Sequence, residues 1–458
     1  MKSNSVVFVL IALLVSFVFV ANGDFMLEEL VSVGLFVFFL LSFIDSIGKS
    51  YNPLDLPILL ALFQCMIMPM VVYRVFNEEF IVVALKYDMT VDPRTYYGYV
   101  FPSILVFIVG VKAPLLFSKN MQLQFRQAMI QSKSYLEGKG NIGILLIIIG
   151  ASIGVLQPFI PGELNYVAYL ISKLLIVGVL YTFLSNAKNR LWFLIGGITF
   201  LFVQALAMAM FGDLVYTLML GVLLILLGRN ISNKLKYSVT LVGLVFLILI
   251  QSIKTDYRAV VWKGKDEENL GKGAFFTLLA DRITNPGQLL EWDSYFPIIV
   301  RANQGMIVGK VMGYIPNYAP YSEGETIFTA IAASFVPRLL WEDKPMSGGH
   351  ANMLRFTGLT IQGYSMNIGP IGEAYGNFGV DGGIVFMLFY GLFFSFAVVV
   401  ILRFIKKRPT LILWFPLLFL NSVQMETDVL MCVNSFLKNA IFCWFCFWAF
   451  DRFLRIKL

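Results

Sequence analysis

The densest group of residues that could carry chemistry lies between positions 324 and 345. Arg338 and Lys344 stand close together between two prolines, which restrict the backbone around them. Arginine forks onto two oxygens while lysine acts as a mobile point charge, so the pair suits a diphosphate. Trp341 between them offers a ring for a sugar face or a membrane boundary. The alternative is that both cations pair with Glu342, Asp343 or lipid headgroups and only dock the segment.

Two further arginines follow apolar runs and are candidate phosphate ligands. If the helix that covers residues 237–253 continues, Arg258 lies about one turn beyond the membrane, at the depth of a headgroup phosphate. Arg301 follows the apolar run 296–300, where a cation needs a partner. For each arginine taken singly, an anchoring role is the alternative.

Candidate proton acceptors are few. Glu373 is a lone carboxylate among glycines and apolar residues, and desolvation near the bilayer surface favours a role as a base. Its alternative role is that of a helix-start carboxylate that accepts from backbone donors. His350, the single histidine, is a second candidate base or an incidental loop residue. Trp262 and Tyr375 are aromatic side chains that could stack on sugars.

The composition indicates the setting of these residues. Of 458 residues, 58% are apolar and 14% are charged, whereas a soluble domain carries about 25% charged residues. The chain is therefore expected to be an integral membrane protein. A net charge of +7 would raise nucleic acid as a partner of a soluble protein. The positions of the charges exclude that partner, as the orientation of the spans indicates.

No metal or cofactor is expected. The four cysteines lie in apolar stretches, and the single histidine is not part of a Cys/His cluster. Carboxylates stay open as ligands for a hard cation.

Twelve apolar runs are expected to form membrane-spanning helices, which predicts an all-α polytopic fold. The runs are 6–21, 30–47, 56–73, 96–117, 142–159, 164–184, 191–210, 214–228, 237–253, 383–402, 411–421 with its flanks, and 429–449. The first run ends in Ala21-Asn22-Gly23, so a cleaved signal peptide is the alternative for it.

Basic residues in alternate loops predict the orientation. With the N-terminus inside, the inner segments carry 18 Lys/Arg against 4 Asp/Glu, and the outer short loops carry only Arg74, Lys86 and Arg94. Both termini are therefore predicted to be cytoplasmic, and the basicity of the chain is a topology signal. The basic segment 118–141 is expected to rest on anionic lipid at the inner face, with a partner site as the alternative.

One long segment, residues 254–376, is predicted to lie outside the membrane between the ninth and tenth spans. It has 11 Lys/Arg and 12 Asp/Glu, and its apolar blocks favour a folded, helical and partly re-entrant subdomain. The predicted organisation is transmembrane helices 1–9 in residues 1–253, an extracytoplasmic loop with the candidate site in 254–376, and helices 10–12 in 377–458.

At these residues the chain resembles the O-antigen polymerase (Wzy-type), or oligosaccharide repeat-unit polymerase, family of bacterial envelopes. The resemblance rests on Pro337-Arg338, Trp341 and Lys344-Pro345, Gly324-Glu325-Thr326, Glu373-Ala374-Tyr375 and Asn377-Phe378-Gly379, with weaker support from Tyr257-Arg258 and Arg301. These motifs span residues 257–379. Outside them, the number of helices and the large late outer loop agree with the family.

The resemblance implies a glycosyltransferase of GT-C type in the bacterial plasma membrane. Such an enzyme transfers a growing glycan from one undecaprenyl-diphosphate carrier to the sugar of a new lipid-linked repeat unit, without a nucleotide sugar or a metal. A flippase and a chain-length regulator are the implied protein partners, and membrane lipid surrounds the helices.

The residue chemistry is consistent with that reaction. Diphosphate ligands are expected to be Arg338, Lys344, Arg258 and Arg301, with Glu373 or His350 as the base and Trp341 and Tyr375 on sugars. An O-antigen ligase, which relies on a loop histidine, is an alternative that His350 keeps open. A polysaccharide transporter or flippase is a second alternative, and a non-catalytic scaffold is a third. A transporter is expected to show matching broken helices in two halves, which the sequence lacks.

Overall fold

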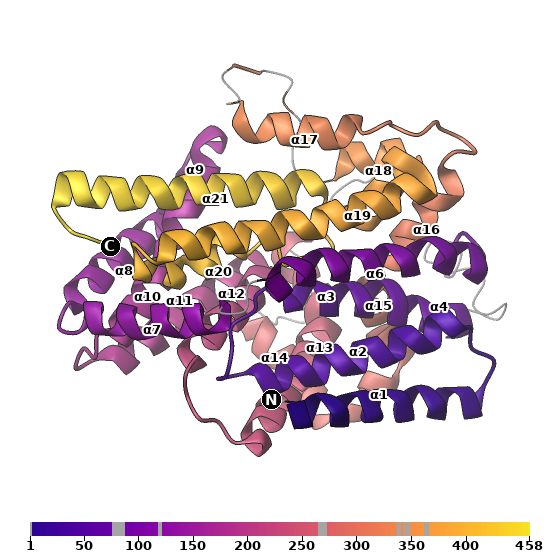
Figure 1. Ribbon diagram of the computed structural model, residues 1–458, viewed down its shortest axis with the longest axis horizontal. Helices are drawn as coiled ribbons and strands as arrows, with labels where there is room; N and C mark the ends of the chain where they lie inside the picture. The colour runs from indigo at the N-terminus through magenta and orange to yellow at the C-terminus, as the bar shows by residue number, and fades with distance from the viewer. Residues whose placement is uncertain are drawn as a thin grey trace.

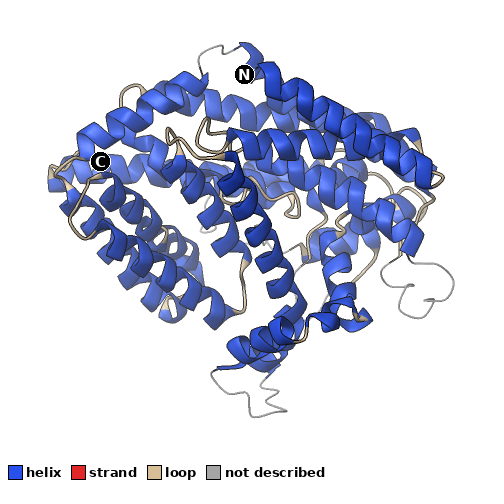
Figure 2. Ribbon diagram, turned by 90° about the horizontal axis from the view of Figure 1, so that it is seen from below, coloured by secondary structure: helices blue, strands red, loops and turns tan. Residues whose placement is uncertain are grey.

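The computed structural model describes residues 2–75, 88–117, 121–263, 273–336, 340–341, 344, 349–360 and 366–458. Within these ranges the chain consists of helices and loops, without strands (Figure 2). The first half contains α1 (Lys2–Asn22), α2 (Leu27–Ser46), α3 (Asp55–Leu62), η1 (Phe63–Ile67), α4 (Met68–Val75), α6 (Pro93–Phe117), α7 (Met121–Leu136), α8 (Gly140–Leu156), η3 (Gln157–Phe159), α9 (Gly162–Ser172), α10 (Leu174–Leu184), α11 (Arg190–Met208) and α12 (Gly212–Leu226).

The second half begins with a helix, α13, that is longer than any helix of the first half. Its elements are α13 (Asn233–Lys263), α14 (Ala274–Thr284), η5 (Pro286–Leu290), α15 (Trp292–Ala302), α16 (Gly305–Tyr314), α17 (Glu325–Phe335), α18 (His350–Thr357), α19 (Gly369–Ile405), η7 (Pro409–Trp414), α20 (Phe415–Phe419), α21 (Val429–Ala449) and η8 (Phe450–Leu454). The segment between α13 and α19 is thus helical where it is described, as the sequence predicts.

Nine helices in the described part of the chain are long and apolar enough to cross a membrane. They coincide with nine of the twelve expected runs, so the all-α polytopic fold is confirmed. The runs that begin at residues 6, 214 and 411 form shorter apolar helices over Asn4–Phe19, Gly212–Leu226 and Pro409–Phe419. Figure 1 shows the long helices running in a similar direction, with α16 and α18 toward one end and α7 toward the other.

Two helices extend beyond the apolar runs that predicted them. Helix α13 continues through residue 254 to Lys263, and α19 begins at Gly369, before the predicted boundary at 376/377. Arg258 therefore lies on a long helix, and Glu373 lies on the helical segment of α19 that precedes a break in that helix, so neither residue is part of an irregular loop. An apolar run marks only the part of a helix that suits lipid. The helix itself continues through polar residues until a helix-breaking residue ends it. Within α19 that break is at Gly379, whose φ of 69° and ψ of −159° are accessible to glycine.

Helices α6 and α19 pack side by side along most of their length (Figure 1). Their backbones approach closely because glycines face each other at the crossing. A Cβ atom on Gly391 would lie 2.6 Å from the carbonyl oxygen of Phe107, and one on Gly110 would overlap the carbonyl oxygen of Leu388. The Tyr99 hydroxyl donates to the carbonyl of Ile371 at 2.7 Å and fixes the beginning of α19 against α6.

This close approach leads to a prediction for stability. Gly110→Ala is expected to destabilise the protein by about 1–3 kcal/mol, because backbone atoms of α19 must move away. Gly98→Ala on the same helix meets no atom within 4 Å and is the matched control. It should be neutral or stabilising by up to about 1 kcal/mol. Thermal unfolding of both purified variants in detergent checks the prediction, and equal melting midpoints would contradict it.

Candidate functional site

Three cations from two helices lie together near the end of α13. Arg258 and Lys254 are one turn apart on α13, and Lys254 interacts electrostatically with Arg258, Arg301 and Glu426. Helix α15 packs on α13 and supplies Arg301 at its last turn. The structure therefore brings together the two arginines that the sequence predicted as phosphate ligands and adds a third cation, which is only 6% exposed.

The end of α13 is held in place by the turn between α11 and α12. The Tyr257 hydroxyl donates to the carbonyl of Leu206 at 2.9 Å, and Arg258 Nε donates to the carbonyl of Ala209 at 3.2 Å. The indole N–H of Trp262 donates to Met208 at 3.1 Å, and the Arg258 guanidinium lies 4.5 Å from the centre of that indole ring. The guanidinium is thus oriented by its own helix and by a neighbouring turn.

Glu426 faces these cations from the segment that joins α20 to α21. Its Oε2 accepts a hydrogen bond of 3.1 Å from Gln64, which belongs to the membrane-length helix Asp55–Arg74. The carboxylate therefore lies against the helical bundle and is half-buried. Tyr216 on α12 lies within electrostatic range of Glu426 and Arg301.

The cluster of Lys254, Arg258, Arg301 and Glu426, hereafter the cation cluster, has excess positive charge. Among the described residues, no carboxylate oxygen lies within 4.0 Å of a charged nitrogen of these three cations, so none of the three forms a salt bridge there. Three cations face one carboxylate that already accepts from Gln64. An anion that enters the cluster would gain charge-assisted hydrogen bonds in a partly desolvated place.

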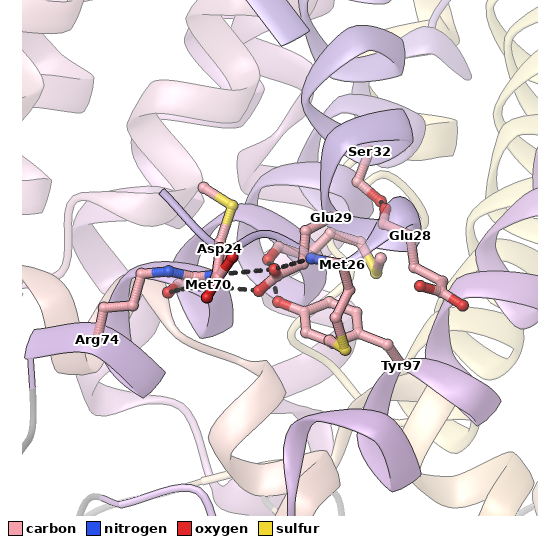
Figure 3. Close-up of polar contacts among 9 residues, drawn as sticks. Asp24, Met26, Glu28, Glu29, Ser32, Met70, Arg74 and Tyr97 are labelled. Carbon is pink, nitrogen blue, oxygen red and sulfur yellow. Dashed lines mark hydrogen bonds and ion pairs between the residues drawn. The ribbon is translucent and has the colours of Figure 1, made fainter. Parts of the chain in front are cut away.

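Some other cations of the bundle form salt bridges, and Arg74 is one of them. Arg74 on α4 forks onto both oxygens of Glu29 on α2, with both N–O distances at 2.8 Å (Figure 3). The same guanidinium donates to the carbonyl of Met70, and the backbone N–H of Met26 donates to Glu29 (Figure 3). Nη2 also donates to the carbonyl of Asp24 at 3.1 Å, so both Nη atoms of Arg74 are occupied by contacts that join the two helices.

Glu373 lies in a second polar group, at the start of α21. Its carboxylate accepts from the Thr326 hydroxyl and from the backbone N–H of Val429, both at 2.8 Å, and the residue is fully buried. Asn377 donates to the Thr326 hydroxyl at 2.8 Å. Asp428 caps α21 by accepting from Met431, and burial raises its pKa above the ordinary value. Glu373 thus ties α17, α19 and α21 together and does not reach solvent in this structure.

The structural role of Glu373 predicts a loss of stability. Glu373→Gln replaces one accepting oxygen with an N–H donor, so either the O–H of Thr326 or the backbone N–H of Val429 loses its acceptor. The expected cost is about 1–3 kcal/mol, measured as thermal unfolding in detergent. Glu325→Gln on α17 is the control, because its exposed carboxylate pairs with Arg355 and should matter little. A Glu373→Gln protein with unchanged stability would contradict this role.

The cation cluster and the Glu373 group share the segment 421–428. Glu426 faces the cations, and Asp428 lies at the start of α21 beside Glu373. The start of α19 packs on the same segment, since a Cβ on Gly369 would lie 2.9 Å from the carbonyl oxygen of Met425. Movement of this segment would therefore change contacts in both the cation cluster and the Glu373 group.

The remaining predicted residues have other surroundings. Tyr375 is nearly buried, with its ring 5.0 Å from that of Tyr99. Trp341 packs against a small apolar group on α17 and α21. Lys344 is 8% exposed and donates to the carbonyl of Val336 at 2.7 Å, at the end of α17. His350 is exposed at the first turn of α18.

Arg338 lies outside the described residues, and so do both prolines, Glu342 and Asp343 of its motif. Its expected partnership with Lys344 on a diphosphate stays a prediction. Of the predicted ligands, only Arg258 and Arg301 are brought into one cluster by the described residues.

Sequence reasoning missed Lys254, Glu426 and Asp428. The predicted boundary makes Lys254 the first residue of the long loop, although its spacing of four from Arg258 places both residues on one face of a helix. The two carboxylates stand in Asn421-Ser422-Val423-Gln424-Met425-Glu426-Thr427-Asp428, a polar run between two apolar runs. This polar run is the feature of the sequence that could have indicated the two carboxylates, and they were missed because the run is short.

Comparison with known proteins gives one match. A family model described as "Domain of unknown function (DUF8712)" matches residues 115–400, more than half of the chain. No curated protein and no solved structure matches.

Proposed function

The chain belongs to the family described as a domain of unknown function (DUF8712), and we propose from its residues that it polymerises lipid-linked oligosaccharides. The substrate is an undecaprenyl-diphosphate-linked repeat unit at the outer face of the bacterial plasma membrane. The single observation that carries the proposal is the cation cluster, which has three cations, one carboxylate and no salt bridge among the described residues. The resemblance of the sequence motifs to repeat-unit polymerases supplies the substrate class.

In the proposed reaction a hydroxyl of the acceptor sugar attacks the anomeric carbon of the donor glycan. The new glycosidic C–O bond forms as the bond from that carbon to the diphosphate breaks, and undecaprenyl diphosphate leaves. Arg258, Arg301 and Lys254 stabilise the negative charge that grows on the leaving group. Each arginine can donate to two phosphoryl oxygens at once, and the flexible lysine can reach a further phosphoryl oxygen as a single point charge.

The attacking hydroxyl loses a proton, which needs an acceptor within hydrogen-bond reach. We assign this role to Glu426, because it is half-buried beside the cations that would hold the leaving group. Glu373 was the sequence-based candidate, and its burial and two occupied oxygens fit a positioning residue better. His350 is exposed and lies on α18 instead of in the cluster.

The proposed setting is a multi-pass protein with both termini in the cytoplasm. The basic residues of the alternate loops support that orientation. A flippase that delivers repeat units and a regulator of chain length are the proposed partners. Neither a metal nor a nucleotide sugar takes part in the proposed reaction.

Deletion of the gene followed by glycan analysis tests the proposal. The deletion strain should accumulate single repeat units on lipid and lose long chains, and the intact gene should restore them. An unchanged distribution of chain lengths would overturn the proposal. Loss of transfer to a lipid A core with full-length polymer on the carrier would indicate an O-antigen ligase instead. Retention of repeat units on the inner leaflet would indicate a flippase.

A further inference from the structure

A cavity of about 570 Å³ lies where α7 meets the turns α2–α3, α10–α11 and α12–α13. Five of the described residues that line it are cations, namely Lys49, Arg126, Lys133, Arg190 and Arg229. None of the lining residues is an aspartate or a glutamate, but Lys49 pairs at 2.6 Å with Asp45, which lies outside the lining, so four of the five cations lack a salt bridge to a described residue. Helix α7, which carries two of these cations, lies toward the opposite end of the molecule from α16 and α18 (Figure 1). Along α13, about 38 Å of helix separates Arg258 of the cation cluster from Asn233, which follows the turn that carries Arg229.

Two of the guanidinium groups share one aromatic ring. The Arg190 and Arg229 guanidinium carbons lie 5.6 Å and 5.4 Å from the centre of the Phe183 ring. The negative face of an aromatic ring attracts a cation, whereas two guanidinium groups beside the same ring carry like charge and repel each other. An anion in the cavity that both arginines line would reduce that repulsion and accept hydrogen bonds from them.

The cavity wall is built by contacts among the surrounding segments. Arg126 Nε donates to the carbonyl of Lys49 at 2.8 Å, and Gly228 N–H donates to the carbonyl of Gly48 at 2.9 Å. Gly48 has a φ of +79°, and a Cβ there would lie 2.6 Å from the carbonyl oxygen of Arg229. The turn after α2 is therefore locked onto α7 and onto the turn after α12, which keeps the cations around a fixed space.

The cavity is also apolar on part of its wall. Ile130 on α7 is 68% exposed, and Met129, Leu184 and Ile225 contribute further apolar surface. A small soluble anion gains nothing from contact with apolar side chains, whereas the glycerol and upper acyl carbons of a lipid pack against them favourably. Basic pockets between membrane helices are known places for anionic headgroups.

We propose that this cavity binds the phosphate-bearing headgroup of an anionic phospholipid of the leaflet that faces the α7 end. A headgroup with two phosphates, as in cardiolipin, suits a cavity lined by Arg126, Lys133, Arg190 and Arg229, which form no salt bridge with a described residue. The site lies apart from the cation cluster, so it stands or falls independently of the proposed polymerase activity.

The test uses purified full-length protein that has been stripped of lipid in a neutral detergent. Short-chain cardiolipin, short-chain phosphatidylcholine and inorganic pyrophosphate are titrated separately, with the melting midpoint and native mass spectrometry as readouts. Cardiolipin should raise the midpoint and give one tightly bound lipid, while phosphatidylcholine should do neither. The double variant Arg190→Gln/Arg229→Gln should bind cardiolipin about 20-fold more weakly.

Lys133→Gln keeps the test valid if the double variant does not fold, because the exposed Lys133 side chain makes no hydrogen bond or salt bridge to another described residue. It should weaken cardiolipin binding about fivefold. Arg403→Gln/Lys406→Gln removes two exposed cations outside the cavity and should bind as the unaltered protein does. Equal binding by all variants, or no response to cardiolipin, would overturn the proposal. A response to pyrophosphate as strong as that to cardiolipin would overturn the lipid assignment and identify a soluble phosphate site.

Discussion

Replacing Arg258 and Arg301 together with glutamine should lower polymer formation about 100-fold while lipid-linked single repeat units accumulate. The two guanidinium groups supply most of the positive charge of the cation cluster, and Lys254 alone leaves the diphosphate partly uncompensated as it departs. The measurement is the glycan ladder of a deletion strain that carries the variant gene, with membrane protein levels determined in parallel.

The controls separate loss of charge from loss of fold. Arg258 also bonds to Ala209, so Arg301→Gln alone is the cleaner variant, because Arg301 is exposed near the end of α15. Arg258→Lys/Arg301→Lys keeps the charge and should retain more activity than the glutamine pair. Arg355→Gln on α18 removes an exposed arginine that pairs with Glu325 and should leave the ladder unchanged. Full polymer from the glutamine pair would show that the cluster does not hold the diphosphate.

Glu426→Gln is expected to reduce polymer formation by about two orders of magnitude without a change in thermal stability. Glutamine keeps an oxygen that can accept from Gln64, so the segment 421–428 should hold its place. What it loses is the ability to take a proton from the acceptor hydroxyl. Initial rates with purified variant protein and the melting midpoint are the two measurements.

The contrast between Glu426 and Glu373 makes this prediction specific. Glu373→Gln should lose stability, with activity falling only as far as the folded fraction falls. If Glu373→Gln is instead stable and inactive while Glu426→Gln is active, the base is Glu373 and the buried group must open during turnover. Glu426→Asp, which keeps the carboxylate on a shorter chain, should show intermediate activity.

Much of the fold could be predicted from apolar runs. Nine of twelve runs are membrane-length helices, because about 20 apolar residues carry both the hydropathy signal and the length of a span. The ends of α13 and α19 could not be predicted in the same way. Helix α13 continues through polar residues beyond its apolar run, and the helical segment at the start of α19 is separated from the apolar part of that helix by the non-helical Gly379.

The site was predictable in part. Arg258 and Arg301 stand out as cations beside apolar runs, and the packing of α15 on α13 brings them together. Sequence alone did not show that Glu426 would join them, since this needs the segment before α21 to fold onto Gln64. Trp341 and Lys344 read as ligands from their spacing, yet they contact α17 and its end. Local spacing does not tell whether a side chain faces a ligand or its own neighbour.

Reconstitution tests the central claim most directly. Purified full-length protein in liposomes is supplied with undecaprenyl-diphosphate-linked repeat units on the accessible face, and the lipid-linked products are separated by length. We expect a ladder of longer chains with one undecaprenyl diphosphate released for each new glycosidic bond, and no ladder with Arg258→Gln/Arg301→Gln. Repeat units that stay single in the presence of folded, unaltered protein would contradict it.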